Sequence, residues 1–175
     1  MRTLNPYLVI GQVLRPQGLW GELKIKPITD DIHRFERLSF VWMEKGGSYQ
    51  KCDMQVTRIS QGYVYATLDG CADRNAAEQY RNMLLYVDRA HAVQLPEGRY
   101  FICDIEGCEV LDAQGNVYGT VREVIQAGSN DVYVIQGKIE YMLPILKDME
   151  ITYNIEEGTI IIQPEMLFEV DARAH

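Results

Sequence analysis

Apolar and polar residues alternate in short stretches along this chain, and turn residues separate the stretches. In one stretch, Leu23 and Ile25 alternate with Glu22, Lys24 and Lys26, which is the two-residue period of a strand with one buried face. The pattern predicts a mainly β protein. Predicted strands cover residues 7–14, 19–26, 40–44, 49–58, 63–68 and 83–87, followed by 108–111, 117–125, 132–135, 141–145, 151–155 and 159–162.

Helical signals are few. The sequence predicts an amphipathic turn over residues 32–38, a short helix capped by Asp73 and running to about Arg81, and a closing helix over residues 164–170. The sequence Pro96-Glu97-Gly98 interrupts any regular element. We therefore expect two small β-barrel domains, at residues 1–90 and 99–170, joined by a linker at residues 91–98.

Composition supports a folded protein. The chain has 175 residues, of which 47% are hydrophobic, and no apolar run approaches the roughly 20 residues that span a bilayer. The four cysteines show no C-x-x-C spacing and no companion histidine cluster, so neither a metal site nor a cofactor is expected. The N-terminus has no basic region followed by a long apolar stretch, and a cytoplasmic protein is expected.

Charge divides unevenly along the chain. Residues 1–95 carry 12 Lys and Arg against 10 Asp and Glu, whereas residues 96–175 carry 5 against 15. A mildly basic half tolerates phosphate, and an acidic half repels RNA and attracts basic proteins. The alternative is that the acidic half only keeps a small domain soluble. Arg122 and Lys147 are isolated cations in that half, and we expect them to form internal ion pairs.

The segment between the first two predicted strands is a candidate nucleic-acid contact. It contains Arg15, Pro16, Gly18, Trp20 and Gly21, and the two glycines allow backbone angles that other residues avoid. Such a loop can grip a phosphodiester backbone with its cations and stack its indole on a base. The alternative is an ordinary barrel hairpin with a solvated outer face.

Two further segments are singled out by their residue types. Tyr100 and Phe101 are adjacent in a segment predicted to be extended, so both cannot face one core, and at least one is expected to lie at an interface or in solvent. The sequence Gly128-Ser129-Asn130-Asp131 predicts a turn in which Asn130 or Asp131 adopts left-handed angles, a structural role.

The first half carries a pattern that resembles a known family. The spacing G-x-V-x-R-P-x-G-x-x-G-E-x-K, followed by T-D, resembles the N-terminal signature of the RimM family of ribosome maturation factors. The second half is similar to the PRC-barrel domain of the same family. The matching residues are Gly11, Val13, Arg15, Pro16, Gly18, Gly21, Glu22, Lys24, Thr29 and Asp30, then Tyr100, Phe101, residues 104–107, Gly115, Gly119, residues 128–133, Leu143 and Pro144.

The resemblance implies a non-catalytic assembly factor of the cytoplasm that acts as a chaperone and not as an enzyme. It would bind the immature 30S small subunit at its head, contacting ribosomal protein uS19 and nearby 16S rRNA, and assist 16S rRNA processing. The implied rRNA contacts are Arg15, Gln17, Trp20, Lys24 and Lys26, and the implied protein contacts are Tyr100 and Phe101. A monomer without a membrane partner is expected. Gln17 and Trp20 depart from the family, which often has His and a cation there.

Two other functions are compatible with the sequence. An RNA-modifying or hydrolytic enzyme would need a catalytic cluster, but none of His33, His91 and His175 has nucleophile or metal-ligand spacing, and the glycines match no nucleotide-binding motif. No catalytic residue is therefore assigned. A PRC-barrel protein-interaction module unrelated to ribosomes is the other alternative.

Overall fold

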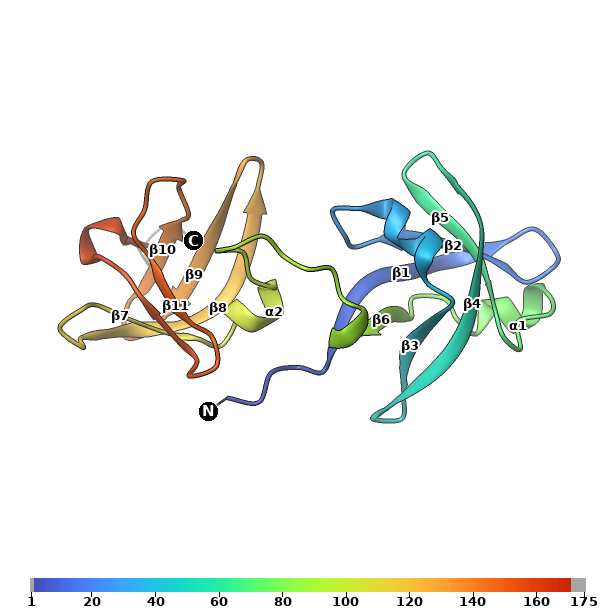
Figure 1. Ribbon diagram of the computed structural model, residues 1–175, viewed down its shortest axis with the longest axis horizontal. Coiled ribbons are helices and arrows are strands. Elements are labelled where there is room, and N and C mark those ends of the chain that lie inside the picture. Colours follow the sequence, from blue (N-terminus) through green and yellow to red (C-terminus); the bar gives the residue numbers. More distant parts are fainter. Residues whose placement is uncertain (1, 171–175) are drawn as a thin grey trace. The chain divides into compact units, whose positions relative to one another are not determined.

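The computed structural model describes residues 2–170, which form two compact units (Figure 1). Residues 6–93 make one unit, and residues 94–170 together with residues 2–5 make the other. Each unit is built around its own sheet, and the prediction of a mainly β protein with two β domains is confirmed.

The first unit is a closed six-stranded barrel. Its strands are β1 (Tyr7–Gln17), β2 (Glu22–Pro27), β3 (Phe40–Lys45), β4 (Ser48–Ser60), β5 (Tyr63–Leu68) and β6 (Leu84–Asp88), in the order β1-β2-β5-β4-β3-β6. Alternate residues point inward, as the sequence predicted for Leu23 and Ile25, which are fully buried. Ile10, Val13, Val41, Met43, Val64 and Leu85 fill the same core.

Strand β1 is longer than predicted. The pairing of β1 with β6 ends at Gln12, but the pairing of β1 with β2 continues to Gln17. Arg15, Pro16 and Gln17 therefore lie in the strand and not in the loop. The sequence placed all three residues between the predicted strands at residues 7–14 and 19–26. Pro16 lies beyond the last residue of β1 that pairs with β6, so β1 is an edge strand on that side, and an edge strand is where a sheet tolerates proline.

Short helices cover the barrel ends. The 3-10 helix η1 (Ile32–Arg37) follows Asp31, whose carboxylate accepts a hydrogen bond from the His33 N–H, and it buries Phe35. Helix α1 (Arg74–Glu78) begins after Asp73, which accepts from the Ala76 N–H 2.8 Å away, so the predicted cap is confirmed. A further 3-10 helix, η2 (Arg89–His91), follows β6.

The second unit is built on one seven-stranded sheet. Its strands are β7 (Glu109–Leu111), β8 (Val117–Ala127), β9 (Asn130–Gln136), β10 (Glu140–Pro144), β11 (Thr152–Asn154), β12 (Thr159–Ile161) and β13 (Phe168–Glu169), in the order β11-β12-β7-β8-β9-β10-β13. The pairing of β12 with β7 is parallel and the others are antiparallel. Nine buried residues form the core: Ile105, Cys108, Val110, Val121, Tyr133, Ile135, Leu143, Ile160 and Ile162.

Two short elements of this unit differ from prediction. The predicted closing helix is only the 3-10 turn η3 (Pro164–Met166), and the chain then forms strand β13 beside β10. Residues 102–105 form helix α2 (Ile102–Ile105), which the sequence did not predict. Proline at the first position of η3 favours helix initiation, but too few residues follow before the chain pairs with the sheet edge.

Arg2 fastens the start of the chain to the second unit. Its guanidinium donates to the carbonyls of Asp104 and Glu106 and to the Cys108 sulfur, and its backbone N–H donates to the Glu156 carbonyl at 2.7 Å. These groups lie more than 100 residues away in the sequence. The chain therefore begins in the second unit, forms the first barrel, and returns to the second unit at residue 94.

Asp112 makes the stability of the second unit depend on pH. Its buried carboxylate accepts hydrogen bonds from the Asn116 side chain, the Gln114 and Asn116 backbone N–H groups and the Tyr118 hydroxyl. These donors, the Asn116 side chain foremost, lower the pKa of Asp112.

Because the folded-state pKa of Asp112 is depressed, its contribution to stability is fully present above the unfolded-state pKa of 3.8 and is lost as pH falls through the folded-state pKa. We expect Asp112→Asn to destabilise the second unit at neutral pH, with the difference from wild type shrinking in that acidic range. Unfolding followed by circular dichroism across pH measures this, and a difference independent of pH would contradict it.

Candidate functional site

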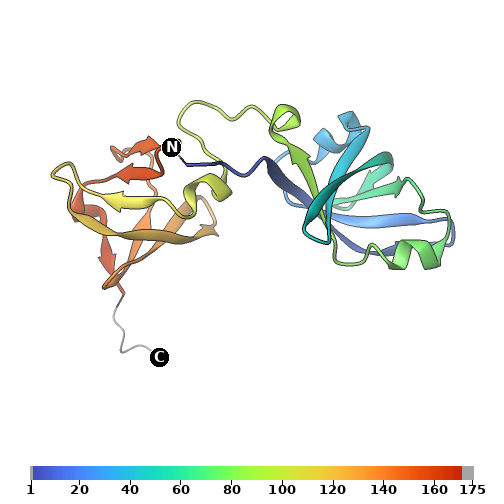
Figure 2. The same ribbon diagram turned by 90° about the horizontal axis from the view of Figure 1, so that it is seen from below.

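Residues 18–21 form a tightly braced loop between β1 and β2 in the first barrel. The backbone N–H of Arg74 donates to the Leu19 carbonyl at 3.1 Å, and the Cys71 thiol donates to the Gly21 carbonyl at 3.1 Å. Gly18 and Gly21 have positive φ, at 72° and 76°. Both ribbon views show the loop beside helix α1 at one end of the barrel (Figures 1 and 2). The bracing fixes the direction of the loop tip.

The tip of this loop presents apolar side chains to solvent. Trp20 is 83% exposed and Leu19 is 66% exposed. A large exposed indole on a loop with a fixed backbone is unusual for a residue with only a packing role, since burial of an aromatic side chain is one of the strongest stabilising contributions in a fold. The indole is therefore available to stack on a ligand.

Cations flank the loop on the outer face of the hairpin. Arg15 and Lys26 are exposed, and Lys24 is half-buried with its Nζ 3.7 Å from the centre of the Tyr63 ring. Within residues 2–170, none of these three cations is part of an ion pair. Gln17 is the last residue of β1 and is half-buried. The structure thus brings all five predicted rRNA contacts onto one hairpin.

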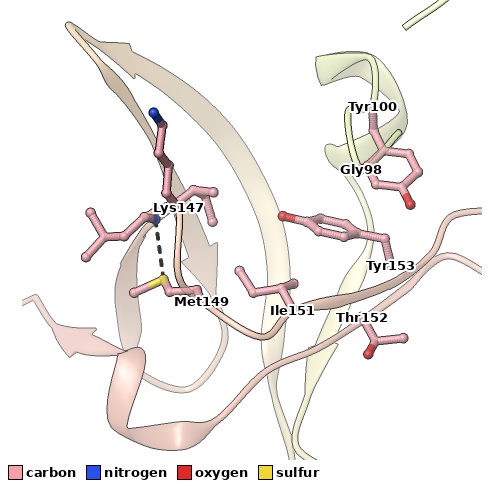
Figure 3. Close-up of a pocket in the computed structure, with 9 residues that line it drawn as sticks. Gly98, Tyr100, Lys147, Met149, Ile151, Thr152 and Tyr153 are labelled. Carbon is pink, nitrogen blue, oxygen red and sulfur yellow. Dashed lines mark hydrogen bonds between the residues drawn. The ribbon is translucent and has the colours of Figure 1, made fainter. Parts of the chain in front are cut away.

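A pocket of about 490 Å³ lies in the second unit (Figure 3). Tyr100, one of the predicted protein contacts, lines it and is 39% exposed. Its ring lies beside that of Tyr153, with 4.7 Å between centroids. The Tyr153 hydroxyl is 3.2 Å from that of the buried Tyr133, and burial raises the pKa of both tyrosines. Both hydroxyls therefore stay neutral, and the rings are held in place.

The other wall of the pocket comes from the segment between β10 and β11. Leu146, Met149 and Ile151 supply apolar groups, and the Leu146 N–H donates to the Met149 sulfur, 3.4 Å away. Lys147 lines the pocket and makes no ion pair among the described residues, contrary to expectation. Arg122, by contrast, pairs with Glu140 at 2.7 Å as predicted. A pocket with this lining can take an apolar side chain.

Phe101 has a different position from its neighbour. It is the N-cap residue of α2, with φ −69° and ψ 139°, and it is half-buried. Only Tyr100 of the predicted pair lines the pocket. Sequence reasoning missed Tyr153 and the apolar residues opposite, because nothing in the local pattern of residues 145–153 indicates that they lie against Tyr100.

Asn130 and Asp131 do not lie in the turn, contrary to the sequence prediction. Gly128 and Ser129 alone form the two-residue loop between β8 and β9, and Asn130 pairs with Ala127 as the first residue of β9. Gly128 takes the positive φ, 65°, which a tight hairpin needs at its first loop position. Glycine meets that need, so neither Asn130 nor Asp131 has to adopt left-handed angles.

Residues 2–170 show no group of three or more His, Cys, Asp or Glu side chains placed to hold a metal ion. No helix among those residues is both long and apolar enough to cross a membrane. The arrangement that is present suits binding: a braced indole with cations on one barrel, and an aromatic pocket on the other unit.

Comparison with known proteins gives the same division of the chain. Residues 8–92 match the RimM N-terminal domain, and residues 97–165 match the PRC-barrel domain. A ribosome maturation factor RimM of Clostridium perfringens is 40% identical over 161 residues, covering 92% of this chain and 95% of the relative. The factor of the same name from Clostridium tetani is 39% identical, covering 92% of this chain and 96% of the relative.

A solved structure of a RimM protein from Pseudomonas aeruginosa is also similar, with 21% identity and a TM-score of 0.46, covering 90% of this chain and 96% of that one. The family assignment rests on the two domain matches and the sequence relatives. With both domains matched in order and relatives near 40% identity over nearly the whole length, the chain belongs to the RimM family.

Proposed function

We propose that this protein is a non-catalytic assembly factor that binds the immature 30S small subunit and assists its maturation and 16S rRNA processing. The observation that carries the proposal is the family membership, since relatives named ribosome maturation factor RimM match 92% of the chain. The protein would act in the cytoplasm, as a monomer and without a cofactor.

The first barrel is assigned to 16S rRNA. Arg15, Lys24 and Lys26 supply positive charge for phosphates, and the exposed Trp20 supplies a stacking surface on a braced loop. Gln17, at the end of β1, can donate and accept hydrogen bonds. Stacking and phosphate contacts together are the usual means of holding unpaired RNA.

The second unit is assigned to a basic ribosomal protein, uS19 in the subunit head. Residues 96–175 carry 15 acidic against 5 basic side chains, which attracts a basic partner. The pocket beside Tyr100 offers apolar side chains, among them Leu146, Met149 and Ile151, in the same half of the chain. A partner segment with an apolar side chain flanked by Lys or Arg fits both features. Phe101, half-buried at the start of helix α2, is the second residue assigned to this contact.

No bond has to be made or broken for this function. If the factor binds one conformation of the immature head more tightly than the others, it shifts the population toward that conformation by its difference in affinity. Trimming of the precursor rRNA then follows from correct folding of the substrate. A catalytic role would instead require a reactive cluster and turnover.

Two substitutions on the hairpin test this function. We expect Trp20→Ala to weaken binding to immature small subunits by roughly 1–3 kcal/mol with an almost unchanged salt dependence, because stacking involves no counterion release. We expect Lys24→Ala to reduce the slope of log affinity against log salt by about 0.7 to 0.9, because a phosphate contact is lost. Co-sedimentation with purified precursors across a salt series measures both.

Wild-type Trp20 emission should change when subunits bind. Wild-type affinity in Trp20→Ala, together with unchanged emission, would show that the loop tip has no part in recognition. Absence of any binding to precursor subunits by the wild-type chain would reject the function itself and favour a PRC-barrel interaction module unrelated to ribosomes.

A further inference from the structure

A row of side chains crosses the outer face of the first barrel at right angles to its strands. Arg15 of β1 pairs with Lys24 of β2, Lys24 pairs with Tyr65 of β5, and Tyr65 pairs with Arg58 of β4. Leu23 and Ile25, on either side of Lys24, are fully buried, so Lys24 points outward. Arg15 and Arg58 are both exposed. The cations thus extend well beyond the predicted hairpin.

Aromatic rings hold two of these cations in position. The Lys24 Nζ lies 3.7 Å from the centre of the Tyr63 ring, and the Arg58 guanidinium carbon lies 4.0 Å from the centre of the Tyr65 ring. Such contacts are attractive and limit the freedom of long side chains before any ligand arrives. Because cations already cover these rings, the row presents charge and not a stacking surface. It suits a ligand's backbone better than its bases.

The length of the row fits a phosphate chain. Neighbouring strands lie about 4.8 Å apart, so the three steps from β1 to β4 span roughly 14 Å. Phosphates of one nucleic-acid strand follow one another at about 3.4 Å along a duplex axis. A single strand is more extended than a strand of a duplex, so at least two of its phosphates can lie along the row at once.

Glu22 is the acidic residue beside this row. Its carboxylate forms an ion pair with Arg58 at 3.2 Å and also accepts a hydrogen bond from the Thr57 hydroxyl. The Glu22 side chain is largely covered, whereas Arg58 is half exposed. In the free protein Glu22 therefore partly neutralises Arg58, while Arg15 and Lys24 make no ion pair within residues 2–170.

We propose that Arg15, Lys24 and Arg58 form a track for the phosphodiester backbone of RNA, read without regard to base sequence, and that Glu22 competes with RNA phosphate for Arg58. The proposal rests on the proposed function and extends the RNA site from the loop across β5 to β4. It assigns a binding role to Arg58 of β4 and a regulating role to Glu22, which lies two residues before Lys24 in β2.

The test uses the full chain and a labelled single-stranded oligoribonucleotide of mixed sequence, with anisotropy measured over a salt series. We expect Arg58→Gln to weaken binding and to reduce the slope of log affinity against log salt by about 0.7, the share of one phosphate contact on a single strand. Arg58→Lys keeps the charge and should keep the slope. The matched control is Arg122→Gln, since Arg122 also belongs to a strand-face ion pair, with Glu140, but in the acidic unit. It should leave binding unchanged.

Glu22→Gln provides the second arm. Freeing Arg58 should tighten RNA binding about two- to fivefold, the range measured for exposed ion pairs. In the double variant with Arg58→Gln this gain should disappear. Melting curves confirm that each variant is folded.

The proposal would be overturned if Arg58→Gln bound the oligoribonucleotide with the affinity and salt slope of the wild type. It would also be overturned if Glu22→Gln tightened RNA binding in a protein that already carries Arg58→Gln. Tighter binding of polyglutamate than of the oligoribonucleotide would overturn the assignment to RNA. If the wild-type protein binds precursor subunits but the Arg58 and Glu22 variants do not change oligoribonucleotide binding as expected, the proposed function stands and the track is rejected. If the oligoribonucleotide arms succeed but no subunit binding occurs, the track stands and the proposed function fails.

Discussion

Gly21→Ala is expected to lower the stability of the first barrel by about 2–5 kcal/mol. Gly21 has φ 76°, where an L-residue costs roughly 1–2 kcal/mol. An added Cβ would lie 1.9 Å from the Cys71 carbonyl oxygen, so the loop or the segment before α1 must shift. Forcing atoms into a packed site costs about 1–3 kcal/mol more. The loss corresponds to a melting temperature lowered by at least about 10 °C.

Tryptophan fluorescence can follow this change in the first barrel alone, because Trp20 and Trp42 are the only two tryptophans of the chain and both belong to that barrel. Gly18→Ala is the matched control. Its φ of 72° is similar, but its added Cβ would have no atom within 4 Å, so only the conformational cost of about 1–2 kcal/mol applies. Equal melting temperatures for the two variants would show that the Cys71 segment does not brace the loop.

Local features of the sequence were enough to find most strands. Strand β5 has the predicted bounds, and β3 and β4 flank Gly46-Gly47 as expected. Asp73 caps α1 because an aspartate just before a helix satisfies a free N–H, whatever the rest of the fold does. Alternation, tight turns and caps depend on neighbours in sequence, which is why they can be read from it.

Features set by distant residues could not be read in this way. Arg15 and Pro16 were placed in a loop because nothing near them shows that β6 ends before they are reached. The Tyr100 pocket joins residues 98–100 to residues 145–153, and Arg2 contacts groups beyond residue 100. Such contacts follow from the topology of the second unit and have no local signature.

The same limit applies to the charges. Counting residues indicates that the first half is mildly basic, but not which cations are available. Pairing across the sheet decides this: Arg58 is held by Glu22, and Arg122 is held by Glu140. Lys24, which the sequence analysis singled out, lies over a tyrosine ring and makes no ion pair within residues 2–170. The sequence therefore predicted which residues belong to the candidate RNA site, and only the fold shows how they are arranged and which of them are paired.

The structure also separates the two residues of the predicted protein site, and this determines the second large effect. Tyr100 lines the pocket, whereas Phe101 is half-buried at the start of α2, so replacing both would mix a binding loss with a folding loss. Tyr100→Ala alone is the sharper variant. We expect it to weaken association with immature small subunits by about 2 kcal/mol or more, roughly thirtyfold, as for an aromatic anchor at the centre of an interface.

The physical reason is that Tyr100 shapes the mouth of the pocket through its contact with the Tyr153 ring, and an apolar side chain of a partner would pack against both. Thermal stability should fall by only about 0.5–1.5 kcal/mol, the value of an aromatic pair, since Tyr100 is partly exposed. Tyr100→Phe keeps the ring and should bind nearly as wild type. Phe168→Ala is the control, because Phe168 is an exposed aromatic residue of the same unit that does not line the pocket. Wild-type subunit binding by Tyr100→Ala would show that the pocket is not where the ribosomal protein docks.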